Sequence, residues 1–493
     1  MTIDVTVIGG GVSGLSAAHA LIGLGYRVAV LERQVRVGGK AYSERIGGFL
    51  MEHGPSSLVA EGAGLSLPAE LGLDHARVEL GAGVQRRYIV ADRRLHGIAI
   101  HPAAFVTNRF LSGAGRLRLL AEALMPGRAN AGEETVAAFC RRRFGREFTD
   151  RVIDSLVCGM FAGRAEQLSM AATFPRLVEM ERTYGSILRA VILGRLSGRR
   201  MPARRLYSWR DGVGTLPNVL AQQLGARVRT GVTVRSIVKH RRGFLVKTAG
   251  DGDLESQAVI IATQPHVAAT LLEHIDSEAA DATARIETPP LAVVFLGYDR
   301  ERIEHPLDSI GYLVPGSERR PVNGALFCST MFPGRAPRGF VSLTAYFGGD
   351  RAPMLARLPA DDLIGLARRE FSELLGAKGD PVLARVRHWP CGLPQYRMGH
   401  RDLVGILDGL SQRRPGLYVT GNYAAGVSVA ACVAHAAQIS MRVDGFLRQR
   451  AASNTARNSE TSAPAHYNSG EPAALRRAFP ESGHARVRST LQL

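Results

Sequence analysis

The chain opens with a buried apolar run, a helical repeat of apolar positions and a second buried run. Residues 2–8, Thr-Ile-Asp-Val-Thr-Val-Ile, are mostly apolar or β-branched, which predicts a short strand buried on both faces. Apolar residues from Leu15 to Leu24 recur at helical spacing, and Gly25 ends this run. A second strand is predicted from Arg27 to Leu31. This order is that of the start of a parallel βαβ unit.

A glycine-rich loop joins the first predicted strand to the helix and fits the pattern G-x-G-x-x-G. Gly9 permits a tight turn, Gly11 lets the backbone approach a pyrophosphate, and Gly14 lets the helix pack closely on the sheet. Glu32 follows the second strand, where an acid can bond the ribose hydroxyls of an adenosine. We therefore predict a dinucleotide site made by Gly9, Gly10, Gly11, Val12, Ser13, Gly14 and Glu32.

Two further segments favour a flavin over a nicotinamide dinucleotide. Gly38-Gly39-Lys40 could offer backbone amides and a cation to a phosphate, although an ordinary solvated turn has the same composition. Near the other end, residues 417–422 predict a strand entering a turn, and Gly426 to Val429 opens an apolar helix through about Leu447. Such a helix N-terminus suits the pyrimidine edge of a flavin. A helix that only packs against the core remains an alternative.

The patterning of the remaining chain predicts an α/β fold with three parts. Strand-like runs at 232–238, 243–248 and 258–263 belong with the first two strands, whereas 117–124 and 136–144 show helical spacing. We predict a discontinuous Rossmann-like dinucleotide-binding domain, a mixed α/β substrate-binding domain and a helical domain, followed by a disordered tail. The dinucleotide-binding domain comprises residues 1–83, 204–264 and 413–449, and the substrate-binding domain comprises 84–98 and 265–412. The helical domain is 99–203 and the tail is 450–493.

Composition indicates the class of protein and its cellular compartment. The 493 residues are 45% hydrophobic, which fits a globular chain with a large core, and no run of 18 apolar residues predicts a membrane span. The first strand starts too early to leave room for a signal peptide. Five cysteines without C-x-x-C spacing fit a reducing cytosol and argue against a disulfide framework or a metal site. We therefore expect a cytoplasmic protein and propose no metal ligand.

The net charge of +18 is carried almost entirely by arginine, because only four of the 62 basic residues are lysines. Attraction to anionic lipid headgroups or to a carboxylate-bearing substrate would use this charge, while a solvated surface would need no function for it. Nucleic acid is a poorer partner because no basic module with interleaved aromatic residues is present. A homodimer is compatible with the sequence, which does not give the oligomeric state.

Several longer strings resemble one flavoprotein family. Glu32-Arg33 followed by Gly38-Gly39-Lys40 is similar to the second signature of the FAD-dependent amine oxidase and protoporphyrinogen oxidase superfamily. The strings that resemble the protoporphyrinogen oxidase and coproporphyrinogen III oxidase family are 52–57, 86–90, 157–163, 166–177, 212–217 and 327–337. The resemblance implies oxidation of a porphyrinogen in haem synthesis, with FAD as cofactor and dioxygen as acceptor. It also implies that the helical domain faces a membrane, which would place the protein peripherally on the cytoplasmic membrane.

The resemblance also assigns roles to individual residues. No Ser-His-Asp, Cys-His or metal constellation is evident, so no side chain is predicted to be catalytic and the chemistry is left to the flavin. Arg87 is predicted to clamp a propionate of the substrate, with a surface arginine as the alternative. Phe327 is predicted to stack on a pyrrole, with a core phenylalanine as the alternative, and Ile310 and Leu313 complete an apolar slot. The further residues carried over to FAD are Arg33, Gly39, Lys40, Gly54, Pro55, Ser56, Ser57, Val234, Asn422, Val427, Ser428 and Val429.

Two other classes of protein stay open at this point. An amine oxidase or an isoprenoid desaturase-like enzyme on the same fold would suit the helical insert and the basic surface. A non-catalytic flavoprotein that carries porphyrin would bind the same molecules without reducing its flavin. Neither the number of propionates on the substrate nor the electron acceptor can be read from the residues.

Overall fold

The computed structural model of the chain describes residues 3–59, 66–99, 110–128, 132–196, 206–241, 243–250 and 252–461. Met1–Leu447 form one compact unit and Arg448–Leu493 a second. Helix α19 spans Val429–Thr461, so the prediction of a disordered tail is wrong for residues 450–461. Alanine and arginine, which favour helix, recur in that segment and continue the helix. Residues 462–493 lie outside the described part.

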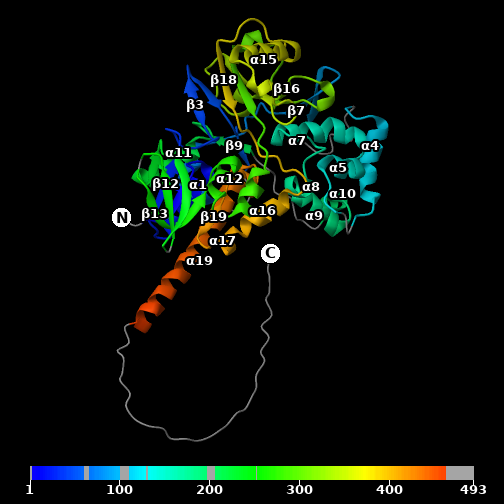
Figure 1. Cartoon of the computed structure of the whole chain (residues 1–493). Helices are drawn as coiled ribbons and strands as arrows, with labels where there is room; N and C mark the ends of the chain where they lie inside the picture. The colour runs from blue at the N-terminus through cyan, green and yellow to red at the C-terminus, as the bar shows by residue number, and fades with distance from the viewer. Residues whose placement is uncertain are drawn as a thin grey trace, which may run out of the picture. The chain divides into compact units, whose positions relative to one another are not determined.

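The three stretches predicted to form one nucleotide-binding domain contribute strands to one sheet. Its strand order is β10 (Val228–Thr230), β2 (Val28–Glu32), β1 (Ile3–Ile8), β13 (Leu254–Ile261), β12 (Gly243–Thr248) and β11 (Val234–His240), and β19 (Leu417–Val419) also pairs with β13. The blue, green and orange parts of the chain meet there in Figure 1. Strands β10, β2, β1, β13 and β19 are parallel, so their carboxyl ends lie along one edge.

Helices cover both faces of this sheet. One face packs on α1 (Val12–Gly23), α11 (Thr215–Leu224) and the first part of α19. The other face packs on α12 (Pro265–Leu272), α13 (Ser277–Ala284), α16 (His400–Asp408) and α17 (Leu410–Arg413). Burial on both faces explains why the strands read as continuous apolar runs rather than alternating ones.

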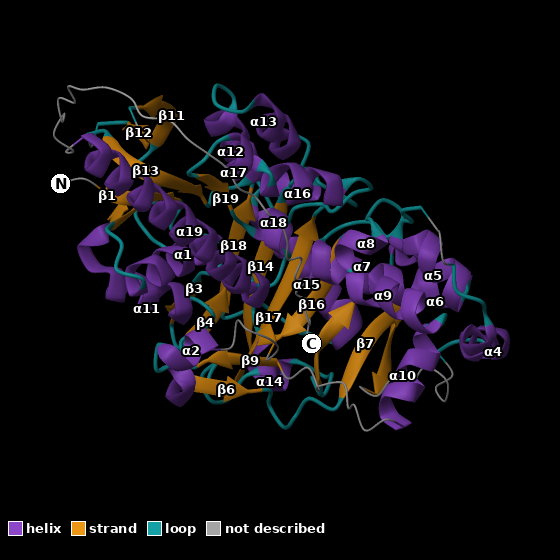
Figure 2. Cartoon of the chain, turned by 90° about the horizontal axis from the view of Figure 1, so that it is seen from below, coloured by secondary structure: helices purple, strands orange, loops and turns teal. Residues whose placement is uncertain are grey.

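A second, mixed sheet stands beside the first, and Figure 2 shows β18, β14, β17, β16 and β7 in this order. Its strands are β18 (Leu383–Trp389), β14 (Leu291–Asp299), β17 (Phe340–Gly348), β16 (Val322–Phe327), β15 (Ser309–Leu313), β7 (Arg86–Ala91) and β8 (Arg94–Ala99). Helix α15 (Ala360–Leu375) buries Leu363 and Phe371 against one face of this sheet. Helix α15 leaves the opposite face of this sheet uncovered.

The described part of the region predicted to be helical consists mainly of helices, joined by short turns and loops. It contains α4 (Gly113–Leu120), η3 (Ala121–Leu124), α5 (Val136–Phe144), α6 (Arg146–Phe148), the π-helical turn η4 (Thr149–Ile153), α7 (Asp154–Phe161), α8 (Met170–Thr173), α9 (Pro175–Tyr184) and α10 (Ile187–Leu196). A fully buried ion pair joins Glu122 to Arg143. The Glu122 carboxylate also accepts bonds from the first amides of α10, at 3.0 Å from Ile187 N and 2.9 Å from Leu188 N, which fixes that helix on the bundle.

Shorter elements connect the two sheets. They are the hairpin β3 (Ser43–Ile46) and β4 (Phe49–Glu52), the small sheet β5 (Leu58–Val59), β9 (Leu206–Trp209) and β6 (Arg77–Glu79), and the turns α2 (Ser66–Glu70), η2 (Leu73–Ala76), η5 (Gly225–Arg227), η6 (Arg300–Arg302), η7 (Gly316–Glu318), α14 (Cys328–Met331), η8 (Leu355–Arg357) and α18 (Asn422–Ala425). Strand β4 packs through Phe49 and Met51 on Phe295 of the second sheet. No helix among the described residues combines the length and the apolar character that crossing a membrane requires.

Candidate functional site

The glycine loop between β1 and α1 has the geometry that its pattern predicts. Gly9 adopts a φ of +112°, and a Cβ there would lie 2.5 Å from the carbonyl oxygen of Ala262. A Cβ on Gly14 would lie 2.0 Å from the Gly9 carbonyl oxygen. By contrast, no protein atom lies within 4 Å of a Cβ built on Gly11. The fold therefore needs glycine at 9 and 14, whereas Gly11 leaves open space at the start of α1 for a ligand to approach.

Glu32 ends β2 directly beside this loop. Its Oε2 accepts a hydrogen bond from Gly10 N at 2.7 Å, and its Oε1 accepts one from Gln34 N at 2.8 Å. These bonds hold the carboxylate at the carboxyl edge of the sheet, where the sequence places the ribose. Arg33 is exposed on the same turn. Val12 and Ser13 form the first turn of α1, so their amides lie at the positive end of that helix.

The second glycine turn lies against the first, as a phosphate-binding role requires. Gly38 N donates to Gly10 O at 2.8 Å, and Gly38 pairs with Gly11 in an isolated bridge. Gly39 adopts a φ of +58°, and a Cβ built there would lie 3.4 Å from the Gly11 Cα. The Arg36 guanidinium donates to Gly39 O at 3.0 Å and so fixes the turn.

Lys40 is a half-buried cation that follows this turn. Its Nζ donates to Gln264 Oε1 at 3.3 Å, and no carboxylate among the described residues pairs with it. Burial lowers the pKa of Lys40 to about 8, because the ammonium has lost most of its hydration. A cation left without a counter-ion beside two glycine turns fits the charge of a dinucleotide phosphate.

The loop after β4 runs along the same edge. A Cβ on Gly54 would lie 2.1 Å from Lys40 O, so the loop passes Lys40 closely. Pro55, Ser56 and Ser57 continue it as half-buried residues before β5. The preceding His53 stacks on Tyr42 with ring centroids 4.8 Å apart and bonds Glu44 Oε2 at 2.9 Å. Burial lowers the pKa of His53 despite this carboxylate, so the ring is held as a neutral, structural group.

The C-terminal segment reaches this edge through β19 and α18. Gly421 and Gly426 flank α18 with φ values of +149° and +113°. The Tyr396 hydroxyl donates to Asn422 O, and Ser428 Oγ accepts from Ala431 N at 3.0 Å, which caps the start of α19. Val427 packs on the helical region and Val429 on the core of the first sheet. Val234 begins β11 as a half-buried residue. The residues predicted for FAD therefore belong mostly to loops that follow parallel strands, where nucleotide sites form.

Strand pairing in the second sheet decides which predicted substrate residues can act together. Leu313 pairs with Gly324 on β16 and with Ile89 on β7, and Gly324 pairs with Tyr346 on β17. Paired residues share a face, and so do residues two apart on one strand. Arg87, Leu313 and Tyr346 therefore lie on one face, called the substrate face below. This face packs on β4 at one end and on η4 and neighbouring residues of the helical region at the other.

The predicted role of Phe327 as a substrate wall is wrong. Phe327 pairs with Leu343 and is fully buried in the core between the sheet and α15, with its ring against Tyr312 and His305. Its side chain thus points away from the substrate face. The partly exposed aromatic on that face is Tyr346, which sequence reasoning missed. On a strand, neighbouring side chains point to opposite faces, so the sequence places Tyr346 on the face opposite to Ala345 and Phe347. The sequence does not say which of the two faces is covered by a helix.

The predicted substrate roles of Arg87 and Ile310 stay predictions. Arg87 is exposed at the start of β7, and no carboxylate among the described residues pairs with it. Nearby protein atoms desolvate its guanidinium and lower its pKa from the usual value. Ile310 is half-buried where the β15–β7 register shifts, so its direction does not follow from the pairing.

Residues 12–443 match the model of the flavin containing amine oxidoreductases, and the chain therefore belongs to this family of FAD-dependent oxidoreductases. This confirms the predicted cofactor, and it accounts for the paired glycine turns and Lys40.

Within that family the chain is similar to porphyrinogen-oxidising proteins. It is 30% identical to protoporphyrinogen oxidase 1, chloroplastic, of Spinacia oleracea, over 91% of this chain and 85% of that one. It is 26% identical to coproporphyrinogen III oxidase of Bacillus subtilis, over 87% of this chain and 95% of that one. A crystal structure from Exiguobacterium sp. 255-15, described provisionally as a protoporphyrinogen oxidase, has the same fold, with a TM-score of 0.79 and 22% identity over 91% of this chain and 99% of that one.

Proposed function

We propose that the protein oxidises a porphyrinogen to a porphyrin with FAD, as a step of haem synthesis. The observation that carries this proposal is the full-length similarity to relatives named for that reaction, including both protoporphyrinogen and coproporphyrinogen III oxidases. The substrate face supports it, because it combines an unpaired arginine with apolar and aromatic side chains. Bound FAD supplies the redox chemistry by accepting two electrons with a hydride, so removing six electrons takes three cycles.

The residues of the chain would bind and orient both molecules. The Gly9–Gly14 loop and Lys40 would hold the phosphates, and Glu32 the adenosine ribose. On the substrate face, Arg87 would pair with a propionate in the bidentate geometry that only a guanidinium offers. Leu313 and Tyr346 would contact the apolar macrocycle, with the tyrosine ring packing on a pyrrole. Positioning, rather than side-chain acid–base chemistry, is the contribution of the protein in this proposal.

The proposal extends to the acceptor and the location. Dioxygen is the proposed electron acceptor, and the proposed location is cytoplasmic and peripheral on a membrane. An exposed apolar surface on the helical region supports the second point: Leu117 is 70% exposed on α4, Leu124 is 83% exposed on η3, and Ile192 and Leu193 on α10 are each 49% exposed. We call these four residues the apolar edge. The elements that carry them are neighbours, because η3 contacts both α4 and α10. Large apolar side chains exposed on neighbouring elements are typical of a surface that docks on lipid or protein.

The decisive experiment is anaerobic reduction of the bound flavin by each porphyrinogen in turn. The purified protein should be yellow, its flavin absorbance should bleach with protoporphyrinogen or coproporphyrinogen, and readmitted oxygen should restore the absorbance with formation of fluorescent porphyrin and peroxide. The ratio of the two rates identifies the substrate. Arg87→Leu should retain the flavin spectrum but lose at least about tenfold in the rate at low substrate.

Reduction by amines or isoprenoids with none by porphyrinogens would reject the proposal in favour of another oxidase on this fold. Porphyrin binding without any flavin reduction would instead indicate a non-catalytic carrier. A protein that cannot be reconstituted with FAD would reject both the proposed function and the assigned cofactor.

A further inference from the structure

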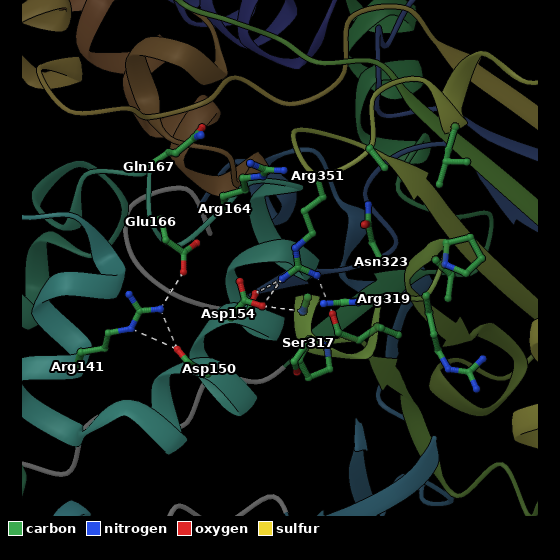
Figure 3. Close-up of a pocket in the computed structure, with 18 residues that line it drawn as sticks. Arg141, Asp150, Asp154, Arg164, Glu166, Gln167, Ser317, Arg319, Asn323 and Arg351 are labelled. Carbon is green, nitrogen blue, oxygen red and sulfur yellow. Dashed lines mark hydrogen bonds and ion pairs between the residues drawn. The ribbon is translucent and has the colours of Figure 1, made fainter. Parts of the chain in front are cut away.

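A cleft of about 760 Å³ lies between the helical region and the hairpin that joins β15 to β16 (Figure 3). One wall comes from α5, η4, the start of α7 and residues 164–167; the other comes from residues 314–323 and 351–355. None of the residues assigned above to FAD or to the substrate face lines it. Its volume falls within the range of about 300–1,000 Å³ that is typical of small-molecule sites.

Three of the arginines in this cleft are already matched by acids. Arg141 bonds Asp150 at 2.9 Å and Glu166 at 3.0 Å, and Arg351 bonds Asp154 at 2.6 Å. Figure 3 shows Arg141 with Asp150 and Glu166, and Arg351 with Asp154; the second of these ion pairs joins one wall of the cleft to the other. The third, Arg320, bonds acids of α15 that do not line the cleft, Glu370 at 2.8 Å and Glu373 at 3.1 Å. These three therefore build the walls and leave little charge for a ligand.

Two other arginines of the cleft are not neutralised in this way. Arg164 Nε lies 4.0 Å from Asp350, and Asp350 is itself bonded by Arg397 at 3.0 Å. Arg319 is exposed, and no carboxylate among the described residues pairs with it. Both guanidiniums line the cleft, from opposite walls. A ligand that reached both would be anionic at two separate points.

Two half-buried apolar residues add to the lining of the cleft. Pro321 lines it from the hairpin and Leu355 from the next loop, whereas Val314, Pro315 and Val322, which also line it, are buried. A small inorganic anion would not use this surface. A molecule with an apolar body and at least two carboxylates would use both the surface and the two arginines.

We propose that the cleft binds a porphyrin through its propionate groups, as a second site separate from the substrate face. The inference rests on the proposed function in one respect: the product of that reaction is a flat apolar macrocycle carrying two or more propionates. Arg164 and Arg319 bind the carboxylates, and Pro321 and Leu355 contact the ring.

Hydrogen exchange of the FAD-loaded full chain tests this proposal without relying on turnover. The probe is coproporphyrin III, compared with its tetramethyl ester, which keeps the ring but has no carboxylate. The free acid should protect amides in 150–167 and in 314–323, and the ester should not. Arg164→Gln combined with Arg319→Asn should remove this protection and weaken binding at the cleft by about tenfold or more. Asparagine suits position 319, where φ is +51°.

The matched control is Arg369→Gln with Arg385→Gln, which removes two exposed arginines outside the cleft and should leave the protection unchanged. Bound FAD and the unfolding midpoint establish that each variant is folded. Absence of protection in the unmodified protein would overturn the proposal, as would protection that survives in the cleft variant. Equal protection by inorganic phosphate would also overturn it. Failure of the proposed function shows separately, as absence of flavin reduction, and leaves this measurement valid.

Discussion

Glu52 and Arg335 form a buried ion pair that joins the end of β4 to the loop before β17. The distance from Arg335 Nη1 to Glu52 Oε1 is 2.7 Å, and both side chains are almost fully buried. Glu52 ends β4 immediately before His53, and Arg335 lies in the loop between α14 and β17. The carboxylate also accepts a bond from Val213 N at 2.9 Å, and Arg335 Nη2 donates to Ser208 Oγ at 2.5 Å.

We expect Glu52→Gln to destabilise the protein by about 3–5 kcal/mol, because it leaves the Arg335 cation buried without a partner. Replacing both residues, as Glu52→Gln with Arg335→Met, should recover part of that loss because no unpaired charge remains. Urea unfolding followed by circular dichroism measures both variants. A loss below about 1 kcal/mol for Glu52→Gln would mean that the pair does not hold the two regions together.

Gly11→Ala and Gly14→Ala should fail in different ways. The Cβ added at Gly11 meets open space, so the FAD-free protein should keep its free energy of unfolding within about 1 kcal/mol, while FAD affinity falls at least about tenfold. The Cβ added at Gly14 meets the Gly9 carbonyl oxygen, so that variant should lose stability even without FAD. Urea unfolding and flavin titration separate the two effects. Equal stability of the two FAD-free variants would contradict this reading of the loop.

Lys40 should make the stability of the FAD-free protein depend on pH. The pKa of Lys40 is about 8 in the folded chain, against 10.5 for a free lysine. The unfolded state therefore binds more protons between these values, and stability should rise from pH 8 to pH 10.5. Below pH 8 the folded protein bears the full cost of the buried cation, up to about 3 kcal/mol.

Lys40→Met should remove that rise, stabilise the FAD-free protein at pH 7 and weaken FAD binding. Unfolding curves at pH 7, 8, 9 and 10 measure the difference between variant and unmodified protein. Lys239→Met, which replaces an exposed lysine, is the control and should leave the pH dependence as it is. If the Lys40→Met and unmodified curves remain parallel across this range, the ammonium is not desolvated.

Phe327 and Tyr346 should separate stability from substrate binding. Phe327→Ala should cost about 3–5 kcal/mol, and the milder Phe327→Leu should remain folded with an unchanged rate per bound flavin. Tyr346→Leu should change stability by less than about 1.5 kcal/mol but lower kcat/KM for the porphyrinogen about threefold to tenfold. Steady-state kinetics normalised to flavin content checks both. A kinetic defect in Phe327→Leu without one in Tyr346→Leu would reverse the assignment of the two faces.

The apolar edge should govern association with anionic lipid vesicles. Leu117→Glu with Leu124→Glu replaces two exposed leucines, so stability should change by less than about 1 kcal/mol. Cosedimentation with vesicles should fall at least about tenfold, because each leucine gains roughly 1.5–3 kcal/mol on leaving water. Met354→Glu with Val382→Glu alters exposed apolar residues elsewhere and should bind as the unmodified protein does. Vesicle binding that is indifferent to the apolar edge would exclude it as the docking surface.

Local patterns in the sequence were sufficient for the nucleotide half of this protein. Strand β1, the glycine loop, α1 and Glu32 are consecutive, and each has one conformation that suits its residues: buried apolar strands, glycines where a Cβ would collide, and an acid at the strand end. The same holds for α5, where the predicted range 136–144 is the observed one. Such features depend on neighbours along the chain, so the amino-acid order alone determines them.

The substrate face required the tertiary structure. Phe327 and Leu313 both lie on strands, and alternation gives each strand two faces without saying which one α15 covers. Pairing across β15, β16 and β17 put Phe327 in the core and brought Tyr346 to the side of Leu313 and Arg87. Likewise, the partners of Lys40 and Arg335, which are Gln264 and Glu52, come from segments hundreds of residues away along the chain. Residue order determined the glycine loop, and only packing between distant strands decided which side chains lie on the substrate face.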